Sequence, residues 1–233
     1  MTLQSYNDIV ATDTHDLSPW RDHDKQHRVL DIVFDLAPSR YYILGDMGEQ
    51  FRSTSAWLES DILQREKLLA HHCDVYFVPG NWPHADRRYL RRLATRLHPI
   101  QIWQADYVDW HLPGRRVRGL HGHQFDKRLR RWLRWRWITP ILPWIGRNIL
   151  HHLPSELAMK NNNEGYMEAV CDIDQAAHKY AIKHGCDILM GHDHRNYKSA
   201  ADDHIIYHLG AAGMRGHSAL ARITDEITLI PVD

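Results

Sequence analysis

An α/β fold is predicted from two features of the first half of the chain. Short segments rich in β-branched and aromatic residues, typical of buried strands, lie at 8–12, 40–44 and 74–78. Stretches with apolar residues near helical spacing lie between them, at 26–36 and 55–71. Strands that alternate with helices predict a largely parallel sheet covered by helices.

The second half of the chain continues this pattern with shorter elements. Strands are predicted at 100–103, 107–112, 116–120 and 187–190, and a helix at 168–184. Three C-terminal segments alternate like strands and are separated by turns, at 205–210, 219–223 and 226–232. We therefore expect one domain over residues 1–233, with a helical insertion at about 126–165.

Composition limits the classes of function. Lys plus Arg and Asp plus Glu both total 29, so no overall field attracts nucleic acid or a membrane. The three cysteines are widely spaced without a CxxC pair, which disfavours a disulfide framework or a zinc finger. We expect them to be small buried apolar groups in a cytoplasmic protein. No signal segment and no apolar run of about 18 residues is seen, so we expect neither secretion nor a membrane span.

The predicted insertion has a distinct composition. Between residues 127 and 147 it carries seven Lys or Arg side chains and no acid, interleaved with four Trp. Such a mixture is expected in a helix at an anionic lipid interface, which would place the protein peripherally at the inner membrane surface. Stacking on single-stranded nucleic acid is disfavoured by the zero net charge. A solvated helix face or an oligomer contact is the structural alternative.

Polar residues directly follow five of the predicted strands. They are Asp13 and His15, Asp46, Asn81, His121 and His123, and His192 and His194. Because the carboxyl ends of parallel strands open onto one crevice, we expect these side chains to meet there. Carboxylate and imidazole together suit divalent manganese, iron or zinc. A glycine before Asp46, Asn81 and His192 would allow a sharp turn and a close approach of backbone to an ion or phosphate.

The chemistry of such a centre is hydrolysis at phosphorus. Two divalent cations can clamp both oxygens of an in-line displacement and activate water near neutral pH. The sequence thus predicts a phosphoester hydrolase.

The motifs D-x-H at 13–15, G-D at 45–46, G-N at 80–81, the His at 121 and G-H-x-H at 191–194 resemble those of the calcineurin-like metallophosphoesterase superfamily. The resemblance implies a four-layer α/β/β/α sandwich and two divalent metal ions, with manganese as the first expectation and iron or zinc as alternatives. It implies the following ligands: Asp13, His15 and His194 for one metal, Asn81, His121 and His192 for the other, and Asp46 as the bridge.

The third motif departs from the superfamily pattern, because Trp82 stands where the usual catalytic histidine is expected. His84 or His123 could supply the proton instead. A pyrophosphate would need that proton less, since its leaving group is weakly basic. The UDP-2,3-diacylglucosamine pyrophosphohydrolase branch also lacks this histidine and carries a helical insertion after the fourth motif, so the layout is similar to that branch.

The resemblance implies a UDP-linked lipid pyrophosphate as substrate. The predicted catalytic residues are Asp46, Asn81, His84 and His123, and the predicted substrate contacts are Trp82, Arg128, Arg131 and Arg134. Trp82 could also simply pack beside the metals. Asp126 could orient a ligand imidazole or cap the inserted helix.

Two other functions stay open at this point. One is a soluble phosphomonoesterase or phosphodiesterase acting on nucleotides or phosphoproteins. The other is a sensor that binds metal and phosphate but has lost turnover with the third-motif histidine.

Overall fold

The computed structural model describes residues 6–16, 18, 21–48, 54–80, 87–127 and 164–232. Most of the predicted insertion at about 126–165 lies outside these residues.

The first sheet contains six strands in the order β11-β10-β1-β2-β3-β4. Its parallel strands are β1 (Asp8–Thr12), β2 (Arg40–Leu44), β3 (Asp74–Val78) and β4 (Gln101–Ile102). The antiparallel strands β10 (Ser218–Ile223) and β11 (Ile227–Val232) complete it beside β1.

The second sheet contains five strands in the order β5-β6-β7-β9-β8. They are β5 (Tyr107–Leu112), β6 (Arg115–Leu120), β7 (Asp187–Met190), β9 (His204–Leu209) and β8 (Asn196–Ala201). The central strands β6, β7 and β9 are parallel, and the two outer strands are antiparallel to their neighbours.

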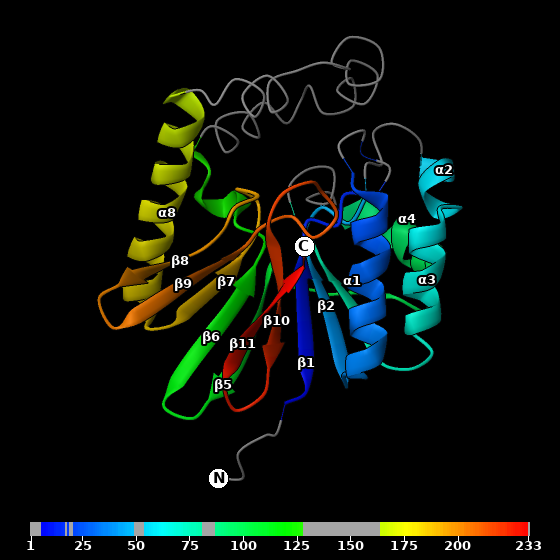
Figure 1. The fold of residues 1–233 in the computed structure, drawn as a ribbon, viewed down its shortest axis with the longest axis horizontal. Coiled ribbons are helices and arrows are strands. Elements are labelled where there is room, and N and C mark those ends of the chain that lie inside the picture. Colours follow the sequence, from blue (N-terminus) through cyan, green and yellow to red (C-terminus); the bar gives the residue numbers. More distant parts are fainter. Residues whose placement is uncertain are drawn as a thin grey trace.

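The described helices flank the sheets (Figure 1). They are α1 (His23–Leu36), α2 (Thr54–Leu58), α3 (Asp61–Leu69), α4 (Arg87–Leu97) and α8 (Glu164–His184), with a 3₁₀ turn η1 (His123–Phe125) after β6.

Three apolar cores separate the layers. The side chains of β1 alternate: Ile9 packs with the helix-side core of the first sheet, whereas Val10 packs between the two sheets. A third core joins α8 to the second sheet through residues such as Ala177 and Ile188. The four-layer α/β/β/α architecture expected from the sequence is confirmed.

Several element boundaries differ from the prediction. The helix predicted over 55–71 is two helices, because Ser60 adopts an extended conformation and its hydroxyl accepts from Leu63 N at 3.2 Å as the N-cap of α3. α4 and β8 were not predicted from the sequence. The predicted burial of the cysteines is wrong for Cys171 on α8, which is exposed; Cys186 is buried, and Cys73 lies between these extremes.

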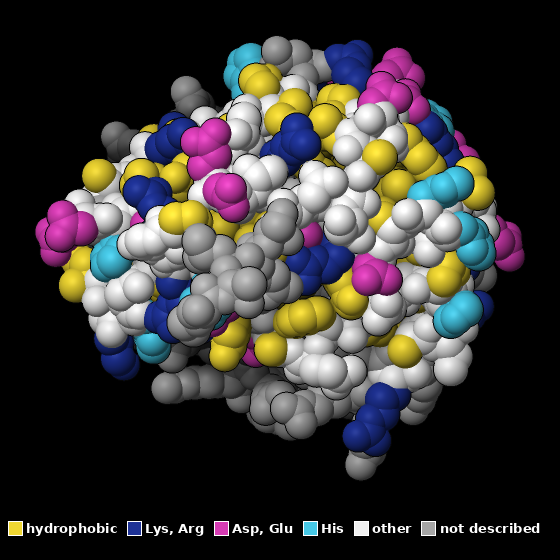
Figure 2. All heavy atoms as spheres, turned by 90° about the horizontal axis from the view of Figure 1, so that it is seen from below, with side chains coloured by type: hydrophobic (Ala, Val, Ile, Leu, Met, Phe, Trp, Pro, Cys, Tyr) yellow, Lys and Arg dark blue, Asp and Glu magenta, His cyan; other side chains and the backbone are white. Residues whose placement is uncertain are grey.

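Charged side chains of both signs are interspersed over the described surface seen from below (Figure 2). Within the described ranges, no helix combines the length and apolar character that a membrane span requires.

Candidate metal centre

The described members of the predicted ligand set converge at the carboxyl ends of strands from both sheets. Asp13 and His15 follow β1, and Asp46 follows β2 in the first sheet. His121 follows β6, and His192 and His194 follow β7 in the second sheet. Asn81 lies outside the described residues, as do Trp82, His84, Arg128, Arg131 and Arg134, so their predicted roles stay predictions.

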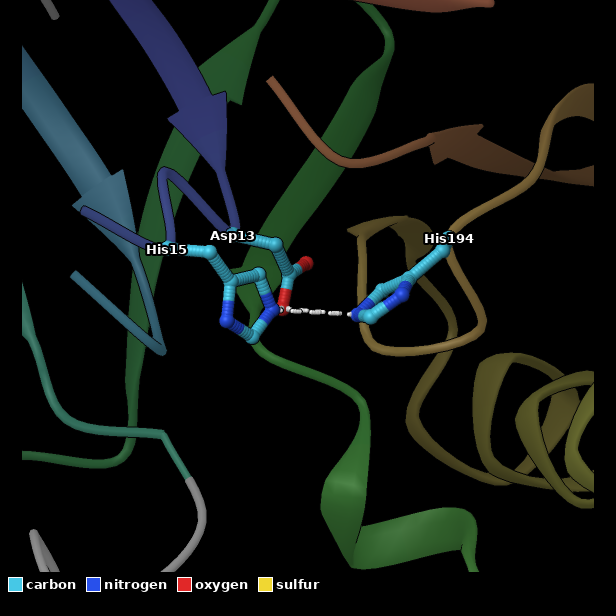
Figure 3. Close-up of side chains that lie close together, drawn as sticks. All are labelled: Asp13, His15 and His194. Atoms are coloured by element: carbon cyan, nitrogen blue, oxygen red, sulfur yellow. Dashed lines mark hydrogen bonds and ion pairs between the residues drawn. The ribbon is translucent and has the colours of Figure 1, made fainter. Parts of the chain in front are cut away.

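One group of donors consists of Asp13, His15 and His194. The two imidazoles point toward each other with the carboxylate between them (Figure 3). Asp13 Oδ1 lies 3.6 Å from His15 Nε2 and 3.7 Å from His194 Nε2, and the two Nε2 atoms are 3.2 Å apart. These three side chains offer one oxygen and two nitrogens to a common point.

A second group consists of Asp13, Asp46 and His121. His121 Nδ1 lies 3.5 Å from Asp13 Oδ1, and His121 Nε2 lies 3.7 Å from Asp46 Oδ2. His192 adjoins this group, with its Nδ1 3.2 Å from His121 Nε2. Asp13 therefore belongs to both groups, whereas the resemblance assigned the bridging role to Asp46.

The Asp13 carboxylate fits a metal ion better than it fits the protein alone. Its Oδ2 accepts a hydrogen bond from the His192 backbone N–H at 2.8 Å, but its buried Oδ1 has no hydrogen-bond partner. A buried unpaired oxygen is costly and rare in native proteins. The Nε2 atoms of His15 and His194 lie 3.6 and 3.7 Å from Oδ1, as expected for ligands that share a cation with it. The Asp and His clusters could thus hold divalent metal.

The protonation states of Asp13 and His121 favour ligation. Burial lowers the pKa of His121 well below its usual range, so the ring is neutral and offers a lone pair. Burial opposes ionisation of Asp13, but the surrounding imidazoles of His121, His15 and His194 outweigh it and hold the Asp13 pKa well below its usual range. An ionised carboxylate beside a neutral imidazole is the pair that a divalent cation requires.

Backbone conformation is unusual at four of these ligands. Asp13, His15, His192 and His194 have φ of 51°, 46°, 61° and 55°. Positive φ is unfavourable for residues with a Cβ and is concentrated at functional sites in proteins. Tertiary hydrogen bonds hold the loops: His15 N donates to Asp46 O at 2.9 Å, and the Thr12 hydroxyl donates to the Gly210 carbonyl.

The motif glycines make room for neighbouring ligands. A Cβ on Gly45 would lie 2.0 Å from His121 Nδ1, and a Cβ on Gly191 would lie 2.0 Å from Asp13 Oδ2. A sharp turn and a close approach of backbone to an ion or phosphate were the predicted roles of these glycines. The structure adds that each lets the donor loops of the two sheets pack against each other.

Asp126 supports a ligand imidazole. Its Oδ2 lies 3.3 Å from His192 Nε2, on the side of the ring away from His121. Burial disfavours the charged ring, but the contact with Asp126 and the nearby Asp13 raise the pKa of His192. Contact of Asp126 with a ligand imidazole is thus present, whereas its predicted role as cap of the inserted helix falls on residues outside the described ranges and stays a prediction.

A buried network that the sequence analysis missed supports the β7 loop. His208 on β9 is fully buried, with Nδ1 2.7 Å from Asp193 Oδ2 and Nε2 3.0 Å from Asp174 Oδ1 on α8. Asp193 stands between His192 and His194, so this network orients the ligand loop. Asp193 is the variable position of the G-H-x-H motif and was given no role from the sequence, and no spacing in the sequence pointed to His208.

His123 lies beside the centre, with its ring centroid 5.5 Å from that of His121. Burial, followed by the charge of His192, lowers the pKa of His123 to about 4. The ring is therefore neutral near pH 7, which disfavours it as a proton donor.

No family model and no curated protein matches this sequence. Among solved structures, the chain is similar to YfcE, a phosphoesterase from E. coli (14% identity, TM-score 0.49, covering 97% of this chain and 100% of that one). It is also similar to an archaeal phosphodiesterase (14%, 0.47, 97% and 99%) and to Vps29 of Chaetomium thermophilum (12%, 0.47, 97% and 94%). These identities and TM-scores are too low for the likeness to bear on activity.

Proposed function

We propose that the protein is a metal-dependent hydrolase of phosphoester bonds. The observation that carries this proposal is the buried, unpaired Oδ1 of Asp13 among three imidazole nitrogens. Carboxylate and imidazole donors on loops from two sheets form a mixed nitrogen and oxygen set suited to manganese, iron or zinc.

The chain's residues divide into two ligand groups that share one carboxylate. Asp13, His15 and His194 would hold one ion, and Asp46, His121 and His192 would hold the other with Asn81. Two such ions supply electrostatic stabilisation of charge at a phosphoryl group and lower the pKa of bound water. Asp126 and Asp193 keep the imidazoles of the β7 loop in place for this task.

The neutral His123 ring supports a substrate with a weakly basic leaving group. Trp82 replaces the usual histidine, so that proton donor is missing. A phosphate anion leaves more readily without a proton than an alkoxide does. We therefore propose a pyrophosphate linked to a nucleotide and a lipid as the substrate class, with Arg128, Arg131 and Arg134 as contacts to its phosphates. Peripheral contact of the insertion with the inner membrane surface belongs to the same proposal.

Side-by-side hydrolysis assays test both levels of the proposal. The manganese-loaded protein is offered a phosphomonoester, a phosphodiester and a UDP-linked lipid pyrophosphate. We expect the pyrophosphate to be turned over fastest, Asp46→Ala to abolish turnover, and Asp203→Ala, at an exposed carboxylate, to leave it unchanged. Turnover of phosphomonoesters alone would contradict the substrate class. Bound metal and phosphate without any turnover would contradict the hydrolase and favour a sensor.

A further inference from the structure

A separate cluster of metal-ligating side chains lies on the helical layer of the first sheet. His23 and His27 stand one turn apart on α1, so their rings project from the same face of the helix. Asp61 is the first residue of α3, which packs beside α1 (Figure 1). None of the three contacts the metal centre described above.

The three donor atoms form a compact triangle. Asp61 Oδ2 lies 2.9 Å from His23 Nε2 and 2.9 Å from His27 Nε2, and the two nitrogens are 3.3 Å apart. Metal to ligand bonds of about 2.0 to 2.1 Å in a tetrahedral zinc site separate its ligands by roughly 3.3 Å. The distance between the two nitrogens equals this ligand separation, whereas the two distances to Asp61 Oδ2 are shorter and have the length of hydrogen bonds. A small outward shift of the Asp61 side chain would complete one face of a tetrahedron, with the fourth position left to solvent.

We propose that this cluster is a second divalent metal site of the zinc class, which ties α1 to α3. Two histidines at i and i+4 on a helix are a ligand arrangement that zinc accepts readily. Access is open, because the side chains of His23 and Asp61 are 44% and 53% exposed. Asp61 adjoins Ser60, whose hydroxyl donates to Asp16 in the loop that follows His15. An ion here would brace the helices on which that loop rests.

The competing explanation of this cluster is an ion-pair network without metal. The contact of Arg65 with His27 differs between the metal-bound and the metal-free cluster. Arg65 Nη1 donates to His27 Nδ1 at 2.6 Å, while its Nη2 contacts Asp31 Oδ1 at 2.5 Å. In this arrangement His27 carries its proton on Nε2. Metal ligation through Nε2 moves that proton to Nδ1, and Arg65 then loses its hydrogen bond to His27 while it keeps its Asp31 contact. Arg65 thus opposes metal binding.

Zinc stoichiometry of the full-length protein tests the site. Wild type and variants are equilibrated with Zn²⁺, separated from free metal and assayed for bound zinc. We expect the double variant His23→Ala/His27→Ala to lose one equivalent of zinc. The double variant His71→Ala/His72→Ala, at exposed histidines, should retain the wild-type content. An unchanged zinc content in the first double variant would overturn the proposal. Because this readout is not activity, failure of the proposed hydrolase would leave it unaffected.

Affinity and spectroscopy provide the second arm. Arg65→Gln removes the competing charge and offers an oxygen to a proton on His27 Nδ1, so we expect a several-fold lower Kd for zinc at this site. Co²⁺ bound in place of zinc should show visible absorption of tetrahedral intensity that disappears in His23→Ala/His27→Ala. Weaker zinc binding by Arg65→Gln would overturn the proposed ligation through His27 Nε2.

Discussion

Gly45 and Gly114 share a left-handed backbone, with φ of 77° and 75°, but only Gly45 is crowded. Nothing lies within 4 Å of a Cβ built on Gly114, whereas a Cβ on Gly45 would collide with the His121 ring. The two positions therefore separate the backbone cost of a side chain from its steric effect on the metal centre.

We predict that Gly45→Ala displaces His121 and loses metal. Gly114→Ala should lower the free energy of unfolding by about 1 to 2 kcal/mol, the cost of a left-handed residue with a Cβ. Gly45→Ala should lower it further, because its Cβ also collides with the buried His121 ring. Bound manganese, measured at equilibrium, should fall in Gly45→Ala only. Equal metal content in the two variants would contradict the steric role of Gly45.

Glu66 is buried on α3 facing the first sheet, and burial followed by the charge of Asp16 raises its pKa well above the usual value. The folded state therefore binds this proton more tightly than the unfolded chain does. Stability contributed by the proton is fully present below the unfolded pKa of about 4.3 and is lost as pH rises through the folded pKa.

We predict that Glu66→Gln is more stable than wild type at pH 8 and has a flatter dependence of stability on pH. A neutral amide removes the conflict between burial and charge, which is worth at most about 1.4 kcal/mol per pH unit for one group. Urea denaturation at pH 5 and pH 8 measures it. The exposed residue Glu59 supplies the control Glu59→Gln, which should behave as wild type. A Glu66→Gln curve parallel to wild type would contradict the raised pKa.

At the scale of the element, the N-caps of α1 and α3 are alike except for one contact. The Asp22 carboxylate accepts a hydrogen bond from Lys25 N at 3.0 Å, and the Ser60 hydroxyl accepts one from Leu63 N at 3.2 Å. Only Ser60 also reaches toward the metal centre, by donating to the buried Asp16.

We predict a larger loss for Ser60→Ala than for Asp22→Ala. Each substitution removes a cap, which costs about 1 kcal/mol, and Ser60→Ala in addition removes a partner of a buried carboxylate at about 1 to 3 kcal/mol. Chemical denaturation of both variants gives the comparison. Equal losses would show that the Asp16 contact contributes nothing to stability.

The strands were predictable because the local sequence pattern of each strand agrees with its burial in the tertiary structure. β1, β2 and β3 are buried short runs that end at polar turns, and the meeting of parallel strand ends brought Asp13, Asp46 and His121 together correctly. The break between α2 and α3 had a readable signal in Ser60–Asp61, an N-cap followed by an acid. α4 was hidden by its arginines, although Leu93 and Leu97 are buried at helical spacing.

The support of the centre could not be predicted in the same way. β8 has no apolar alternation, and it is stabilised by pairing with β9. His208 reaches Asp193 and Asp174 only because β9 lies between the β7 loop and α8 in three dimensions. Such contacts depend on how the layers pack, and they produce no periodic pattern of residues in the sequence.

At the scale of the whole molecule, one buried carboxylate joins the two sheets. Asp8 on β1 accepts from Trp110 Nε1 of the second sheet at 2.8 Å and from Arg40 Nε at 2.9 Å. Asp8 pairs with Arg40 in register, and Arg40 pairs with the exposed Asp74 on its other side. Asp74 therefore serves as the control for Asp8, because it is also a carboxylate beside Arg40 but does not accept the hydrogen bond from Trp110.

We predict that Asp8→Ala lowers the free energy of unfolding by about 3 kcal/mol, because it leaves a buried indole N–H and a partly buried guanidinium without their acceptor. Asp74→Ala should cost less than about 1 kcal/mol, as expected for an exposed charge. Urea denaturation of the two variants checks both values. Similar losses would contradict the role of Asp8 between the sheets.

The metal centre straddles these two sheets, since one supplies Asp13 and His15 and the other supplies His194. The distances between its donor atoms therefore depend on the thickness of the apolar layer between the sheets, where Val10 and Leu189 pack. Substitution of these apolar side chains by smaller ones would change the size of ion that fits between the donors, although no donor residue is altered. If the centre holds metal as proposed, its preference among divalent ions would depend on the packing of the protein interior as well as on the donors.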